Sequence, residues 1–255
     1  MNNLLDVGAV SKRFGGVDAL ADVSLTIGRG EIYGLIGPNG AGKTTFFNVL
    51  TGFYQPSAGT FTFDGRALDL RGPHRVAAAG IARTFQNIRL FGNMTALENV
   101  MVGRHLRTRA GVLGAVLRTR RTRAEERAVH ETARALLEYV GIVSREHDVA
   151  HSLPYGDQRR LEIARALATE PKLLALDEPA AGMNATETAA LRALLARIRA
   201  DGTTILLIEH DVQLVMGLCD RVAVLDYGRK IAEGVPAEVQ RDAGVIEAYL
   251  GGTLA

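Results

Sequence analysis

Four short apolar runs do most to limit how this chain can fold. They occupy residues 31–36, 173–177, 203–208 and 221–226. Continuous apolar runs of this length are typical of parallel strands that are covered on both faces. Because helical patterns alternate with these runs, the sequence predicts an α/β fold with a doubly wound parallel sheet.

Two further patterns divide the rest of the chain. Residues 23–27 and 59–65 alternate apolar and polar positions, as antiparallel strands do. Residues 87–170 show helical periodicity without a convincing strand. One apolar stripe in that stretch consists of Val129, Ala133, Leu136, Leu137 and Val140. We therefore expect an N-terminal antiparallel β subdomain and an inserted α-helical subdomain beside the parallel sheet.

These patterns predict one domain, residues 1–255, built from several parts. We assign residues 1–86 and 160–240 to the core with its antiparallel part, residues 87–159 to the helical subdomain and residues 241–255 to a C-terminal helix or tail. Within the core, Asn184 and Glu187 have the spacing of a capping box at the start of a helix.

Composition and charge exclude several classes of protein. Lys and Arg number 30 against 28 Asp and Glu, so the net charge of +2 is too small to indicate nucleic-acid binding. Cys219 is the single cysteine, which rules out an internal disulfide. No window approaches the roughly 20 apolar residues of a membrane span, and the N-terminus does not have the pattern of a signal peptide.

A glycine-rich motif follows the first apolar run directly. The sequence GPNGAGKT at 37–44 matches G-x-x-x-x-G-K-[ST] and lies between a predicted strand and a predicted helix, which is the context that a phosphate-binding loop requires. Glycines allow backbone amides to surround an anion, and a helix N-terminus adds positive potential. The motif therefore predicts an α/β fold with a P-loop core. The predicted nucleotide-binding residues here are Gly37, Pro38, Asn39, Gly40, Ala41, Gly42, Lys43, Thr44 and Thr45.

Within this motif, Lys43 is placed to reach the β- and γ-phosphates, and the hydroxyl of Thr44 is placed to bind Mg²⁺. Polar residues also follow two of the other apolar runs. Asp177 and Glu178 come at the end of the second run, where ligands bind in open α/β sheets. We predict Asp177 as a Mg²⁺ ligand, Glu178 as the base for an attacking water and His210, after the third run, as a γ-phosphate contact.

Another glycine turn, LPYGDQ at 153–158, precedes a clear helical pattern. Taken alone, it is a proline-glycine turn ahead of an ordinary helix. A loop of this kind that leads into a helix N-terminus is also suited to binding an anion.

In their order along the chain, these motifs resemble those of the nucleotide-binding subunit of ABC transporters. The matching segments are Walker A at 37–44, a Q-loop RTFQ that ends at Gln86, a signature at 153–158, Walker B at 173–178, a D-loop at 179–184 and an H-loop at His210. The resemblance implies a RecA-like P-loop core and an ATPase that uses ATP and Mg²⁺, with Gln86 reaching the metal and the attacking water. It also implies that Phe14 stacks on adenine.

In this family the signature of one subunit covers the ATP that is bound by the Walker A of another. The resemblance therefore assigns Leu153, Tyr155, Gly156 and Asp157 to a partner's nucleotide, in a head-to-tail pair closed by ATP. Pro154 stands where serine is common, and it brings neither a hydroxyl nor a backbone donor. Capping must then rely on the amides near Tyr155 and Gly156 and on the helix end. Asn184 likewise ends the D-loop where aspartate is usual.

Longer stretches resemble the LivG-type ATPases of branched-chain amino acid importers. They are YGDQRRLEIARAL, DEPAAGMN, TILLIEHD, LVMGLCDR and AYLGG. This resemblance implies a peripheral subunit on the cytoplasmic face of the inner membrane. Its partners would be transmembrane permease subunits and a second ABC ATPase, identical or paralogous, with a substrate-binding protein acting indirectly. The alternatives are an ATPase of lipopolysaccharide export, a soluble ABC ATPase without a permease, and a nucleotide-gated binding module without turnover.

The resemblance also directs attention to two segments of the helical region. Leu90, Phe91, Met94 and Leu97 would line a cleft for an amphipathic helix of the permease, or else belong to the core. Residues 104–123 contain seven arginines and no acid, which suits either anionic lipid headgroups or a solvated face.

Overall fold

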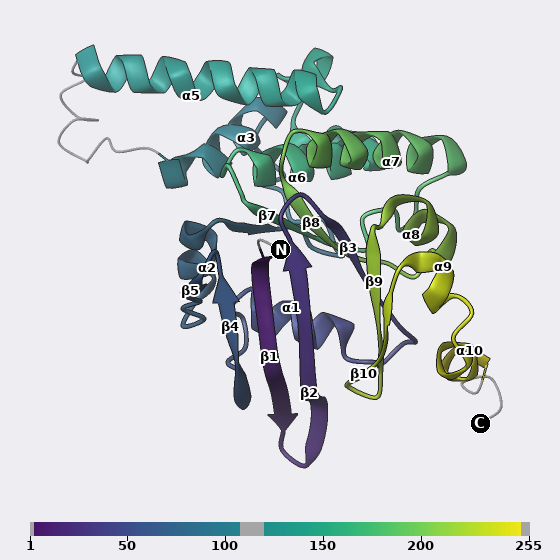
Figure 1. The fold of residues 1–255 in the computed structure, drawn as a ribbon. Helices are drawn as coiled ribbons and strands as arrows, with labels where there is room; N and C mark the ends of the chain where they lie inside the picture. The colour runs from purple at the N-terminus through teal and green to yellow at the C-terminus, as the bar shows by residue number, and fades with distance from the viewer. Residues whose placement is uncertain (1–2, 108–119, 251–255) are drawn as a thin grey trace. The chain divides into compact units, whose positions relative to one another are not determined.

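The structure is a computed structural model that describes residues 3–107 and 120–250 (Figure 1). It divides the chain into two compact units. The first unit combines Met1–Arg83 with Lys172–Ala255, and the second is Thr84–Pro171. The sequence had placed these boundaries after residues 86 and 159. The difference arises because the helix that follows the signature turn, α6 (Tyr155–Leu167), packs against helices of the second unit.

A six-stranded sheet forms the centre of the first unit, in the order β10-β9-β3-β8-β7-β6. Its strands are β3 (Ile32–Ile36), β6 (Ile81–Arg83), β7 (Leu173–Asp177), β8 (Thr204–Ile208), β9 (Arg221–Asp226) and β10 (Arg229–Gly234). The pairings of β6, β7, β8, β3 and β9 are parallel, and β10 adds to β9 in the antiparallel direction. Every residue of β3, β7 and β8 is buried, which confirms the predicted parallel sheet.

The predicted antiparallel part is a second sheet of the same unit, in the order β2-β1-β4-β5 (Figure 1). Its strands are β1 (Asn3–Phe14), β2 (Val17–Gly28), β4 (Ala58–Phe63) and β5 (Arg66–Ala67). The pairing of β1 with β2 shifts register at several positions. Side chains of both sheets share one apolar core that includes Phe46 and Phe47.

The helices of the first unit are α1 (Lys43–Leu50), α2 (Pro73–Ala79), α7 (Ala185–Ala200), α8 (Val212–Leu218), α9 (Pro236–Val239) and α10 (Ala243–Leu250). Helix α7 starts where the sequence predicted. The side chain of Asn184 accepts a hydrogen bond from the Glu187 amide, and the Glu187 carboxylate accepts one from the Asn184 amide. This completes the predicted capping box.

Helices are the main regular elements of the second unit within its described residues, 84–107 and 120–171, beside one isolated β-bridge between Thr95 and Val149. The unit contains α3 (Ala96–Arg104), α5 (Arg120–Tyr139) and α6, joined by loops and three short 3₁₀ turns, His105–Arg107, Val143–Arg145 and Ala150–Ser152. Ala133, Leu137 and Val140 of the predicted apolar stripe are buried. Residues 108–119, which hold much of the arginine-rich segment, lie outside the described residues.

Candidate functional site

The glycine-rich motif forms a loop between β3 and α1. Gly37, Gly40 and Gly42 have φ angles of 148°, 82° and 101°, a region that side chains other than glycine rarely adopt. A Cβ atom on Gly37 would lie 2.1 Å from the carbonyl oxygen of Leu225, and one on Gly42 would lie 2.6 Å from that of Ala19. The loop therefore needs glycine at these two positions, both for its backbone angles and for its contact with neighbouring strands.

Hydrogen bonds to the β9–β10 turn hold the same loop in shape. The amide of Gly228 donates to the Ala41 carbonyl at 3.0 Å, and the amide of Ala21 donates to the Gly228 carbonyl at 2.8 Å. Within the loop, the Ala41 amide donates to the Pro38 carbonyl at 3.2 Å. The turn thus links the glycine loop to β2.

Lys43 is the first residue of α1, and its side chain is buried. Its Nζ donates to the carbonyl oxygens of Gly37 at 2.6 Å and Pro38 at 2.9 Å, so the ammonium lies inside the loop. Burial lowers the pKa of Lys43, while the charges of Glu178 and Asp177 oppose that shift. These two carboxylates are therefore part of the same site.

The start of α1 is suited to a phosphate. Its N-cap is Gly42, which offers no side-chain cap, and the first amides of a helix have no partner within it. Thr44 is exposed beside them. The open amides, the buried ammonium and the glycine backbone together fit the phosphates of a nucleotide.

Asp177 ends β7, where the sequence placed it, and its side chain is almost fully buried. Nη2 of Arg83, the last residue of β6, donates to its Oδ2 at 3.0 Å. Nη1 of the same guanidinium donates to the side chains of Asn48 at 2.7 Å and Thr51 at 2.9 Å, both at the end of α1. Sequence reasoning did not single out Arg83, because its partner lies 94 residues away and no local pattern links the two.

Glu178 and His210 come together at the ends of β7 and β8. Nδ1 of His210 lies 3.7 Å from Oε2 of Glu178. Glu178 has a φ angle of 45°, and its amide donates to the Ile208 carbonyl at 2.9 Å. The imidazole is largely exposed, so it can reach a ligand as well as the glutamate.

A neighbouring acid, Glu209, supports this arrangement and was missing from the predicted site. It is buried and accepts hydrogen bonds from the amides of Ala180 at 2.9 Å and His210 at 3.2 Å. Burial raises the pKa of Glu209, and these backbone donors oppose that shift. Glu209 thus fixes the backbone of the predicted D-loop relative to that of His210.

Phe14 is half-exposed at the end of β1. Its ring meets that of Tyr54 edge to face, with centroids 5.2 Å apart, and Nζ of Lys12 lies 4.8 Å from its centroid. The ring is therefore available to a planar ligand, and its stacking on adenine stays a prediction.

Gln86 and the signature residues belong to the second unit. Gln86 is exposed, Leu153 and Gly156 are buried, and Tyr155 is exposed at the first position of α6. Pro154 is the N-cap and provides no side-chain cap, as expected from its ring. The first hydrogen bond of α6 runs from the Gln158 amide to the Pro154 carbonyl, so the amides of Tyr155, Gly156 and Asp157 precede the bonded part of the helix.

The sequence suggested two contact surfaces in the second unit, an apolar cleft for a permease helix and an arginine-rich segment for lipid headgroups. The structure supports each of them only in part. Leu97 is buried and belongs to the core, whereas Phe91 and Met94 are exposed. Of the arginine-rich segment, Arg104 donates to Glu170, and Arg107 donates to the Thr169 carbonyl at 2.8 Å. These two arginines therefore have structural contacts within their own unit.

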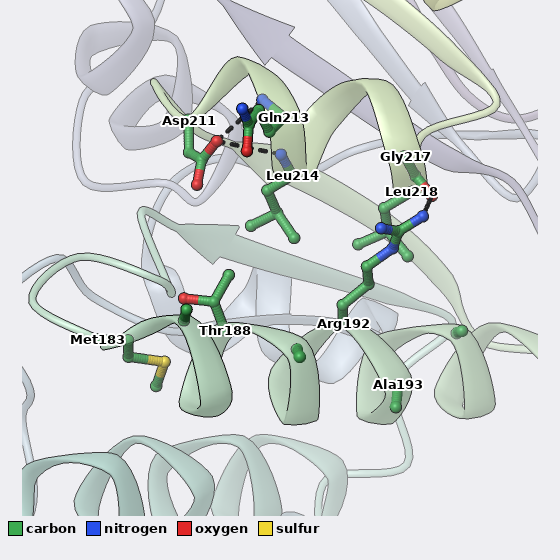
Figure 2. Close-up of a pocket in the computed structure, with 12 residues that line it drawn as sticks. Met183, Thr188, Arg192, Ala193, Asp211, Gln213, Leu214, Gly217 and Leu218 are labelled. Carbon is green, nitrogen blue, oxygen red and sulfur yellow. Dashed lines mark hydrogen bonds between the residues drawn. The ribbon is translucent and has the colours of Figure 1, made fainter.

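A cavity of about 730 Å³ lies between α7 and α8 of the first unit (Figure 2). Figure 2 shows Arg192 crossing it to the Gly217 carbonyl, and Asp211 capping α8 through the amides of Gln213 and Leu214. The predicted site residues are absent from its lining. The cavity is thus separate from the cluster at the glycine loop.

Comparisons with known proteins agree with this geometry. The ABC transporter family model matches residues 20–181, and a model of the branched-chain amino acid ATP-binding cassette transporter matches residues 229–255. The chain is 47% identical over 249 residues to the high-affinity branched-chain amino acid transport ATP-binding protein LivG of Salmonella typhimurium, covering 97% of this chain and 98% of that protein. It is 45% identical to BraF of Pseudomonas aeruginosa, with the same coverage.

The fold also matches that of solved structures. An ATP-binding cassette of an ABC transporter in its ADP conformation superposes with a TM-score of 0.85 at 32% identity, covering 98% of this chain and all of that one. Among the described residues, no helix has the length and apolar character needed to cross a membrane. The chain therefore belongs to the ABC transporter family, as one of its ATP-hydrolysing, ATP-binding subunits.

Proposed function

We propose that this chain powers an importer of branched-chain amino acids or closely related amino acids. LivG and BraF, which it matches over nearly its full length, are named as branched-chain amino acid transport proteins. The C-terminal match at residues 229–255 is to a family model of the same transport system. The cargo is assigned on this similarity.

The observation that carries the chemistry is the contact of Glu178 with His210, 3.7 Å apart at the strand ends. Glu178 accepts a proton from a water that attacks the γ-phosphorus of ATP. The bond between that phosphorus and the β–γ bridging oxygen then breaks, releasing ADP and phosphate. A base of this kind contributes about 10²–10⁴-fold to the rate.

The other groups of the site bind the triphosphate rather than exchange protons. Lys43, now bonded to the carbonyls of Gly37 and Pro38, turns its ammonium toward the β- and γ-phosphates. His210 holds Glu178 and hydrogen-bonds the γ-phosphate. Phe14 stacks on the adenine. Thr44, Asp177 and Gln86 would hold Mg²⁺, which neutralises charge on the phosphates.

The signature turn acts on the nucleotide of a second ATPase subunit, identical or paralogous. Because Pro154 has neither an amide nor a hydroxyl to offer, the amides of Tyr155, Gly156 and Asp157 at the start of α6 supply the anion contacts, next to Leu153. Binding of ATP favours the closed head-to-tail pair, and loss of the γ-phosphate removes that preference.

Permease subunits are the remaining partners, which places the chain on the cytoplasmic face of the inner membrane. The exposed Phe91 and Met94 of the second unit offer apolar contacts for a helix of the permease. The substrate-binding protein acts only through those membrane subunits.

Hydrolysis is tested with Glu178→Gln, which keeps the shape of the side chain but cannot accept the proton. Phosphate release is expected to fall about 10²–10⁴-fold while ATP binding persists. Glu238→Gln, at an exposed position of α9, is the matched control and keeps the wild-type rate. A wild-type rate in Glu178→Gln would remove Glu178 as the base.

The cargo requires the assembled transporter. Reconstituted with its permeases and binding protein in vesicles, the chain is expected to drive ATP-dependent uptake of labelled leucine, isoleucine or valine. If none of these amino acids is taken up while ATP hydrolysis is intact, the cargo assignment is overturned and the ATPase assignment stays in place.

A further inference from the structure

Helix α6 of the second unit contains a fully buried ion pair. Nη1 of Arg159 lies 2.8 Å from Oε2 of Glu162, and the two side chains are 0% and 1% exposed. The residues are three apart and so lie on the same face of the helix. Removing two charges from water costs several kcal/mol per ion, and a well-packed apolar pair is often equally stable. This pair therefore calls for a role other than stability.

Both members of the pair bond to the backbone of one segment, residues 85–89. Nη1 and Nη2 of Arg159 donate to the carbonyls of Phe85 at 2.6 Å and Gln86 at 2.9 Å. Oε1 of Glu162 accepts from the amides of Phe85 at 3.2 Å and Arg89 at 3.4 Å. The ion pair thus forms hydrogen bonds with backbone carbonyls and amides of this loop. Without the pair, these groups would bond to water.

The same guanidinium also reaches the signature turn. Nη2 of Arg159 donates to the hydroxyl of Tyr155 at 3.2 Å, and its central carbon lies 5.9 Å from the centre of that ring. Tyr155 is the first residue of α6. One planar group therefore joins the peptide of Gln86 to the residue that begins the signature helix.

We propose that Arg159 and Glu162 are positioning residues that fix the backbone of residues 85–89 to the first turn of α6. Gln86 is exposed, but its carbonyl is held by Arg159, so the clamp fixes the backbone from which its side chain extends. As a result, Gln86 and Tyr155 move as one body. The kinetic consequence rests on the proposed function, in which these residues serve the nucleotide of their own chain and that of its partner.

The test uses the full chain with Arg159→Met and Glu162→Leu combined. The two new side chains fill the space of the ion pair without carrying charges. Two readouts are measured: amide hydrogen exchange at Phe85 and Arg89, and steady-state hydrolysis of Mg-ATP. We expect exchange at these two amides to rise at least about 10-fold as their acceptor is lost. We expect kcat to fall about 10–100-fold, as for a misplaced catalytic group, with ATP affinity within about 2-fold because the phosphate loop is untouched.

The control is Arg145→Met, which breaks an exposed pair with Asp148 that has the same i,i+3 spacing in the same unit. It is expected to leave both readouts unchanged. Arg159→Lys is the second variant, since it keeps the charge in the core but replaces the planar two-nitrogen fork by a single ammonium nitrogen on a shorter reach. It is expected to move both readouts in the same direction as the double variant.

Unchanged exchange and kcat in the folded double variant, or in Arg159→Lys if the double variant fails to fold, would overturn the clamp. The proposed function fails separately, if the wild-type chain and its assembled transporter hydrolyse no ATP. The exchange experiment needs no hydrolysis, so it decides the clamp in either case.

Discussion

Nη2 of Arg83 lies 3.0 Å from Oδ2 of Asp177, and both side chains are more than nine-tenths buried. Through Asn48 and Thr51, the same guanidinium is bonded to the helix that follows the glycine loop. Arg83 therefore ties the predicted metal ligand to the element that binds the phosphates. It is also the last residue of its unit before the chain enters the second unit at Thr84.

Replacing Arg83 by Met is expected to destabilise the protein by about 3–5 kcal/mol, because one partner of a buried ion pair is removed. Hydrolysis is expected to need more Mg²⁺, since Asp177 loses the group that orients it. Urea unfolding and a Mg²⁺ titration measure these effects. Arg13→Met, which breaks the exposed pair with Asp18, is the control and changes stability by less than about 1 kcal/mol. Equal losses in the two variants would contradict the prediction.

Glu178 has a left-handed backbone, which costs a residue other than glycine about 1–2 kcal/mol. Glu178→Gly is therefore expected to be more stable than Glu178→Ala by about 1 kcal/mol, while both variants lose hydrolysis. Thermal unfolding compares the two. At Arg197, inside α7, the order is reversed, with Gly about 0.8–1 kcal/mol less stable than Ala. If the Gly variant were less stable than the Ala variant at Glu178 as well as at Arg197, the backbone of Glu178 would not be strained.

Asn184 caps α7 where aspartate is usual in the family. Asn184→Ala is expected to lower the free energy of unfolding by about 1 kcal/mol, because the Glu187 amide loses its acceptor. Asn184→Asp keeps an acceptor at the positive end of the helix and is expected to match the wild type within about 0.5 kcal/mol. Denaturant unfolding of the three proteins checks this, and a stable Ala variant would count against the capping box.

The phosphate site makes ATP binding depend on pH through Lys43. Burial lowers the pKa of this lysine in the free protein, so its charge is lost at a lower pH than that of an ordinary lysine. ATP binds the charged form, and affinity is therefore expected to fall as the pH rises through this lowered pKa. Titrations of ATP between pH 7 and pH 10 measure the decline. Lys43→Arg stays charged over that range, and a parallel decline in this variant would assign the effect to another group.

Continuous burial explains why the parallel strands were predictable from the sequence. A continuous apolar run such as LLALD indicates by itself that the strand is buried on both faces, and a capping box is likewise a local pattern. The end of the helical insertion was not predictable in this way. Helix α6 follows a turn in the sequence like many others, and only its packing against α3 and α5 assigns it to the second unit.

The residues of the candidate site likewise divide into those that a local pattern marks and those that it does not. The glycine loop, Asp177, Glu178 and His210 could be predicted because motifs and strand ends mark them. Arg83 and Glu209 could not, because each acts through partners that are distant in the chain or through backbone groups. The side-chain contacts of Arg159 were equally hidden, since its loop partners lie 73 and 74 residues away.

The bonds from the β9–β10 turn to Ala41 and Ala21 have one more consequence. A loop that already has the shape required by its ligand loses little conformational freedom when the ligand arrives. More of the contact energy with the phosphates then remains as affinity, and association does not wait for the loop to fold. The hairpin turn thus contributes to the speed of nucleotide capture.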